Sequence, residues 1–150
     1  MRKDTHSNTW IVVANSARAV VLRTEPARKH RRWHVVSTLA HGESREHGID
    51  LETDKAGEVM HFGTGRSALE HTPVKETEAK KFAGELSQML EAAHNADSFD
   101  RVVLAASPLF LGYLRAALTP GVEPCVTGSM DKDYTHLPPA GIQEQLIGLV

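Results

Sequence analysis

WIVVANSARAVVLR, residues 10–23, predicts a β-hairpin near the start of the chain. The first five residues form a continuous apolar run, which is typical of a strand buried on both faces of a sheet. Asn15, Ser16 and the two residues after them carry turn chemistry. Residues 19–23 are mostly aliphatic or β-branched, so we expect them to return as the second strand.

Residues 33–40 predict a third strand, in which alternate side chains face opposite sides of the sheet. Strict alternation places on one side Trp33, Val35, Ser37 and Leu39. Residues 42–71 then show no sustained period and hold five glycines among many charges. Segments of this length inside a compact domain are usually functional or disordered. We therefore predict an irregular functional loop at residues 42–71.

A long amphipathic helix is predicted directly after this loop. Thr72 fits the N-cap position, and Pro73 fits the first helical position. Apolar residues then recur at helical spacing, which predicts one face packed in the core. That face comprises Ala79, Phe82, Ala83, Leu86, Met89, Leu90 and Ala93.

The rest of the chain alternates strands and helices. Residues 102–106 predict a buried strand, Ser107 is interpreted as the N-cap of a helix that runs to about residue 118, and residues 122–127 predict a last strand. Pro138 and Pro139 open a final helix. The whole predicts one α/β domain, residues 1–150, with a mixed sheet of about five strands, helices packed on it and a long loop before the main helix.

Composition limits the class of protein. Seventeen Lys and Arg against nineteen Asp and Glu give a net charge of −2, which excludes a strongly basic nucleic-acid binder but allows a local basic patch. The polar tail, residues 1–8, lacks a signal-peptide core, and no apolar run approaches the ~20 residues of a membrane span. The single cysteine, Cys125, is interpreted as a small buried hydrophobe. We expect a cytoplasmic protein without a cofactor. The sequence does not determine its oligomeric state.

Two motifs are candidates for phosphate or RNA contact. In the predicted loop, Gly63, Thr64, Gly65, Arg66 and Ser67 offer backbone N–H groups and a guanidinium to an anion, although they match neither a Walker A motif nor a dinucleotide-binding motif. The second motif is a basic run with four formal charges, formed by Arg28, Lys29, Arg31 and Arg32 around His30. The alternative interpretations are a flexible loop apex and a solvated hairpin tip.

Metal and catalytic motifs are weaker. His41, His47, His61 and His71 lie on or beside the loop, but their spacing fits no zinc site, so we expect solvated histidines and no metal. His61 or His71 could act as a general acid or base. No Ser-His-Asp arrangement with a nucleophile elbow is present. Residues 131–135, DKDYT, are interpreted as a polar turn rather than a cation site.

Several blocks resemble, in order and spacing, the bacterial host attachment protein family: WIVVANSARA at 10–19, FDRVVLAASP at 99–108, FLGYLR at 110–115 and DKDYT at 131–135. That family is similar to the middle domain of eukaryotic and archaeal peptide-chain release factors. The resemblance implies a mixed sheet and a long loop before a long helix. In release factors this loop bears Gly-Gly-Gln, whereas residues 57–67 here carry Gly-Thr-Gly-Arg.

The resemblance and the basic run favour a non-enzymatic or weakly enzymatic RNA- or ribosome-associated binding domain without release-factor catalysis. Two alternatives stay open. The first is a protein-interaction module in attachment or envelope regulation, acting through the same loop. The second is a hydrolase or phosphate-handling enzyme that uses His61 or His71 with Arg66.

Overall fold

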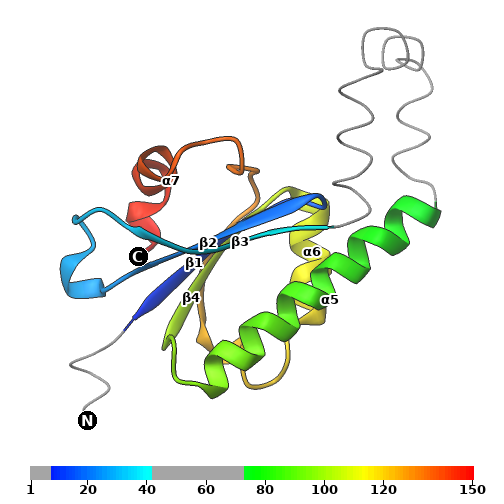
Figure 1. Ribbon diagram of the computed structural model, residues 1–150, viewed down its shortest axis with the longest axis horizontal. Helices are drawn as coiled ribbons and strands as arrows, with labels where there is room; N and C mark the ends of the chain where they lie inside the picture. The colour runs from blue at the N-terminus through cyan, green and yellow to red at the C-terminus, as the bar shows by residue number, and fades with distance from the viewer. Residues whose placement is uncertain (1–7, 42–72) are drawn as a thin grey trace, which may run out of the picture.

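The computed structural model describes residues 8–41 and 73–150, which form a mixed five-stranded sheet covered by helices (Figure 1). The strand order is β3-β2-β1-β4-β5. The strands are β1 (Thr9–Ala14), β2 (Arg18–Thr24), β3 (His34–Ala40), β4 (Arg101–Ala106) and β5 (Val126–Met130). The helices are α5 (Pro73–Asn95), α6 (Pro108–Ala117) and α7 (Pro139–Leu146). The predicted α/β class with a mixed sheet is confirmed.

Strand β1 lies at the centre of the sheet, and all six of its residues are buried. It pairs with β2 in antiparallel orientation, as the hairpin prediction requires, and with β4 in parallel orientation. Strands β4 and β5 are also parallel and are joined through α6. The carboxyl ends of β1, β3, β4 and β5 therefore meet at one end of the sheet, called the carboxyl end below.

Different helices cover the two faces of the sheet (Figure 1). Trp10 and Val12 of β1 pack with side chains of α5 and α6, such as Phe82 and Phe110. Ile11 and Val13 face the other way and pack with α7. This alternation follows from the two-residue period of a strand. Every residue of the predicted core face of α5 is buried or packed against the core.

Two strand predictions are corrected. In β3, Val21 pairs with Ser37 but Leu22 pairs with Val35, so Val36 is an extra residue in a bulge. Trp33 consequently packs on the α7 face and Leu39 on the α5 face, whereas strict alternation placed both on one side.

The last strand begins later than predicted. The Val122 N–H donates to the carbonyl of Thr119, and the Cys125 N–H donates to that of Val122, so these backbone groups are used in turns. Pro124 has no N–H to offer a ladder, and residues Glu123–Cys125 form a 3-10 helix instead. Pairing with β4 starts only at Val126.

Candidate functional site

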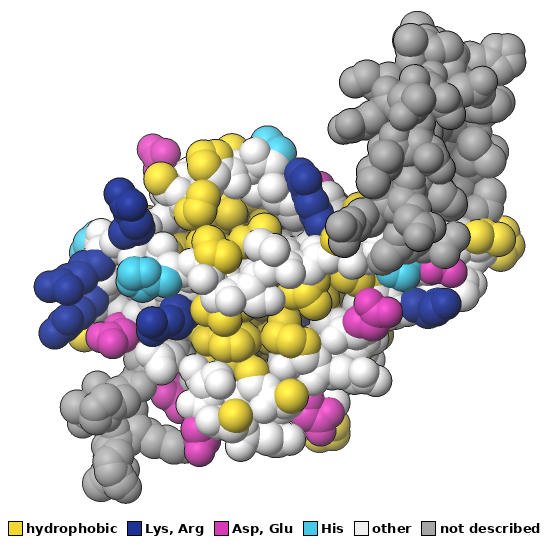
Figure 2. Space-filling view, viewed as in Figure 1, with side chains coloured by type: hydrophobic (Ala, Val, Ile, Leu, Met, Phe, Trp, Pro, Cys, Tyr) yellow, Lys and Arg dark blue, Asp and Glu magenta, His cyan; other side chains and the backbone are white. Residues whose placement is uncertain are grey.

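The turn between β2 and β3 gathers arginine side chains around a surface hollow of about 170 Å³. Its lining residues are Arg23, Thr24, Glu25, Arg28, Arg31, Arg32 and His34. Figure 2 shows Lys and Arg side chains gathered at the end of the molecule where this turn lies in Figure 1. Four arginines thus line the hollow together with a single acidic residue, Glu25. We call it the arginine hollow.

The basic run is only part of this hollow. Arg28, Arg31 and Arg32 line it, while Lys29 does not. Arg23 and His34 come from the strands on either side and face each other in the β2–β3 register. Antiparallel pairing about the turn was the signal that could have identified them. The Glu25 carboxylate lies 3.8 Å from Nε of Arg28, and both side chains are about half exposed, so the pair contributes little stability and the hollow keeps an excess of positive charge.

A second hollow, of about 430 Å³, lies at the carboxyl end of the sheet. Ser16 after β1 and Ser107 after β4 line it, with Tyr113 of α6 and residues near the start of α5. Ser107 occupies the N-cap position of α6 as predicted, but its side chain makes no capping hydrogen bond. Its carbonyl instead accepts the N–H of Leu111 at 2.8 Å.

Asn15 links the β1–β2 turn to the segment after β5. Its side-chain oxygen accepts the N–H groups of Ala17 and Arg18, and its amide nitrogen donates to Oδ2 of Asp133 and Oγ1 of Thr135. Partial burial raises the pKa of Asp133, but hydrogen bonds from Thr135 and Asn15 outweigh it and lower the pKa overall. These bonds use the Asp133 carboxylate in a turn, in line with the predicted role of residues 131–135.

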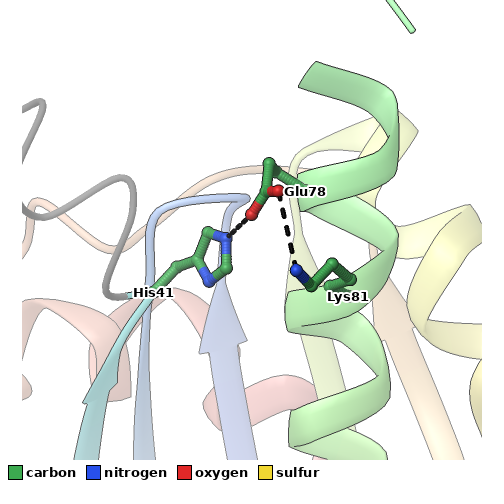
Figure 3. A network of polar contacts seen from close by, with 3 residues as sticks. All are labelled: His41, Glu78 and Lys81. Atoms are coloured by element: carbon green, nitrogen blue, oxygen red, sulfur yellow. Dashed lines mark hydrogen bonds and ion pairs between the residues drawn. The ribbon is translucent and has the colours of Figure 1, made fainter. Parts of the chain in front are cut away.

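His41 is buried, which corrects the expectation of a solvated loop histidine. The residue is 5% exposed, and its Nε2 lies 2.6 Å from Oε1 of Glu78 on α5 (Figure 3). Lys81 reaches the other oxygen of Glu78 at 3.7 Å. The hydrogen bond with His41 lowers the pKa of Glu78. Nδ1 of His41 is buried with no hydrogen-bond partner among the described residues.

The other candidates fall outside the described residues. These are the loop motif and the loop histidines: His47, His61, Gly63, Thr64, Gly65, Arg66, Ser67 and His71. Within residues 8–41 and 73–150, no group of three or more histidine, cysteine or acidic side chains is arranged to hold a metal ion. Cys125 is partly exposed rather than fully buried, and desolvation raises the pKa of its thiol, with a contribution from Asp100.

Among the helices of the described ranges, none combines the length and apolarity needed to cross a bilayer.

Taken together, these features define an α/β protein with a mixed sheet, a basic turn at one end and polar networks at the other. Residues 10–146 match the model of the family described as "protein required for attachment to host cells". The chain belongs to that family, so the resemblance seen in the sequence is confirmed.

Other comparisons give weaker likenesses. No curated protein matches the chain significantly. A crystal structure of an archaeal translation termination factor, aRF1, is similar at 10% identity and a TM-score of 0.49, covering 97% of this chain and 40% of that one. A structure titled "Archaeal protein" is similar at 12% identity and a TM-score of 0.45, covering 94% and 37%. This chain thus spans less than half the length of either.

Proposed function

We propose that this protein is an RNA-associated binding domain that contacts the phosphate backbone through the arginine hollow, without release-factor catalysis. One observation carries the proposal: four arginines, Arg23, Arg28, Arg31 and Arg32, line a single small hollow. A planar guanidinium can donate two parallel hydrogen bonds to one phosphate, so several around one hollow suit a polyanion better than a single carboxylate.

The charge of the whole chain shapes the expected mode of binding. Because the net charge is −2, attraction to RNA must come from the local patch rather than from the overall field. Such binding weakens steeply as salt rises, since each phosphate contact releases counterions. Further contacts with the phosphate backbone of RNA are proposed for Lys29, beside the hollow, and for the motif Gly63, Thr64, Gly65, Arg66 and Ser67. An RNA or ribosomal partner implies a cytoplasmic site of action.

The test combines ribosome co-sedimentation with binding of a labelled single-stranded RNA at several salt concentrations. Arg31→Glu combined with Arg32→Glu is expected to weaken RNA binding at least roughly tenfold, because a hydrogen bond to a charged group contributes about 1.5–3 kcal/mol. The salt slope, which is the slope of the logarithm of RNA affinity against the logarithm of salt concentration, should become shallower by roughly two. Arg115→Glu combined with Lys132→Glu makes the same charge change away from the hollow, at exposed positions on α6 and after β5, and should leave binding near wild type.

Two results would contradict the proposal. One is the absence of the wild-type protein from ribosomal fractions and from RNA at low salt. The other is an equal loss of binding in both double variants, which would indicate an effect of net charge alone.

A second candidate function is a protein-interaction module in attachment or envelope regulation. The observation that favours it is the exposure of Val35 and Val36, 47% and 40%, on the edge strand β3 directly after the basic turn. Exposed apolar side chains on an unpaired edge are a common docking feature. A pull-down that returns one defined protein, unaffected by nuclease and lost in a Val35→Lys variant, would favour this function over RNA binding.

A further inference from the structure

Gln143 on α7 makes three hydrogen bonds with the basic turn, which is the segment between β2 and β3 that carries Arg28, Lys29, Arg31 and Arg32. Its Oε1 accepts the Trp33 N–H at 3.0 Å. Its Nε2 donates to the carbonyl of Arg31 at 2.8 Å and to that of Lys29 at 3.2 Å. One side chain, 110 residues away from Trp33 in the chain, thus uses both its acceptor and its donors on this turn.

Trp33 completes the attachment. Its indole ring is 1% exposed and packs in the core against α7, and its Nε1 donates to the carbonyl of Lys29 at 3.0 Å. The Lys29 carbonyl therefore accepts two hydrogen bonds from fixed side chains. Two backbone hydrogen bonds also lie within this turn: the Arg28 N–H donates to the carbonyl of Glu25, and the Arg31 N–H donates to the carbonyl of Arg28.

These bonds constrain the backbone that carries the arginines. The carbonyl of Arg31 and the N–H of Trp33 flank Arg32, so fixing both restricts the path of the chain from Arg31 to Trp33. Arginine side chains lose less entropy on binding when their backbone is already ordered. A turn of exposed, like-charged residues would otherwise repel itself into many conformations.

We propose that Gln143 is a positioning residue that presents Arg31 and Arg32 to a phosphodiester in the arginine hollow. The inference rests on the proposed RNA-binding function and adds the residue that organises the site. Gln143 touches no phosphate itself, because its polar atoms are used by the turn.

The test replaces Gln143 by methionine, which has similar length but makes none of the three hydrogen bonds. The matched control is Gln145→Met on an exposed position of the same helix. Binding of a short labelled oligouridylate is measured across a salt series, with inorganic phosphate as a competitor and thermal unfolding as a check on folding. Gln143→Met should bind about fivefold more weakly, with a salt slope shallower by roughly one, because fewer arginines reach phosphates together. Gln145→Met should match wild type.

The outcomes separate the two proposals. If wild type and Gln143→Met bind RNA with equal affinity and equal salt slope, while Arg31→Glu with Arg32→Glu loses binding, the positioning role is wrong and the RNA function stands. If wild type binds no RNA, the function itself fails. A merely structural role would lower the unfolding temperature but leave the salt slope of the folded protein unchanged, and that result also overturns the inference.

Gln143→Glu provides a second variant if Gln143→Met does not fold. It keeps the acceptor for the Trp33 N–H and loses both donors, and Gln145→Glu supplies the same charge nearby as a control. Weaker binding and a shallower slope for Gln143→Glu than for Gln145→Glu would support positioning, and equal values would refute it.

Discussion

Replacing Asn15 by alanine should destabilise the protein, because this side chain links two distant segments at the carboxyl end of the sheet. The Asn15 side chain makes four hydrogen bonds, two with the β1–β2 turn at 2.8 and 2.9 Å and two with Asp133 and Thr135 at 2.9 and 3.1 Å. These bonds connect the β1–β2 turn to a segment about 120 residues later in the chain. Alanine leaves all four partners without this contact.

The magnitude follows from the kinds of bond that are lost. A typical hydrogen bond contributes about 0.5–1.5 kcal/mol net, and one to a charged group about 1.5–3 kcal/mol. Water can replace part of the two turn bonds, since the turn is partly exposed. We therefore expect a loss of about 3 kcal/mol in the free energy of unfolding, or roughly 6–12 °C in Tm for a domain of this size.

The loss should depend on pH, because the pKa of Asp133 is lowered in the folded protein. A lowered pKa stabilises the fold above the unfolded value of about 3.9, and this contribution disappears as the pH falls through the folded pKa. Asn15→Ala removes one of the hydrogen bonds that lower this pKa. The difference between variant and wild type is therefore largest near neutral pH and smaller under acid conditions.

Urea unfolding followed by circular dichroism, at neutral pH and at about pH 2, measures both effects. Asn95→Ala, at an exposed asparagine at the end of α5, is the control and should change stability little. A change below about 0.5 kcal/mol for Asn15→Ala would show that water replaces these bonds fully. An equal loss at both pH values would show that Asp133 is not part of the network's stabilising effect.

Three further predictions concern the core, the bulge and the buried histidine. Phe82→Ala should cost about 3–5 kcal/mol in urea unfolding, because its ring is fully buried between His41 and Phe110; a cost near 1 kcal/mol would contradict this packing. Deletion of Val36 should leave a cooperatively folding protein, since it removes the extra residue of the bulge and keeps Trp33 and Leu39 on their observed faces; loss of cooperative unfolding would contradict the assignment of Val36 as the extra residue. The pKa of Glu78 is lowered in the folded protein, so its carboxylate stabilises the fold above the pKa of the unfolded state, and this contribution is lost on acidification. Glu78→Gln should therefore flatten the acid side of the profile of Tm against pH. A profile matching that of the exposed control Glu85→Gln would exclude this effect.

Local periodicity was enough to predict the hairpin and α5. Residues 10–14 are buried on both faces and α5 buries one stripe, and each pattern is visible in a single segment of chain. The faces of β3 were not predictable in this way. The bulge at Val36 depends on which residues of β2 lie opposite, and that register is a property of two strands together.

The same distinction between local and long-range signals applies to the residues of the candidate site. The basic run could be predicted because its charges are contiguous in sequence. Arg23 and His34 join it only through strand pairing, and Gln143 only through packing of α7 on the sheet. His41 was misassigned because its burial depends on Glu78 and Phe82, which come from a helix after the predicted loop.

Strand direction separates the two polar regions of the molecule. Thr24, which lines the arginine hollow, pairs with Thr9 at the amino end of β1, whereas Asn15 and His41 lie at the carboxyl end of the sheet. Sites at opposite ends of a sheet with no shared partners usually respond independently to mutation. Asn15→Ala should therefore lower stability without changing the RNA affinity of the folded protein, and Arg31→Glu with Arg32→Glu should do the reverse. Coupling between the two effects would mean that the carboxyl end, with its larger hollow, takes part in binding.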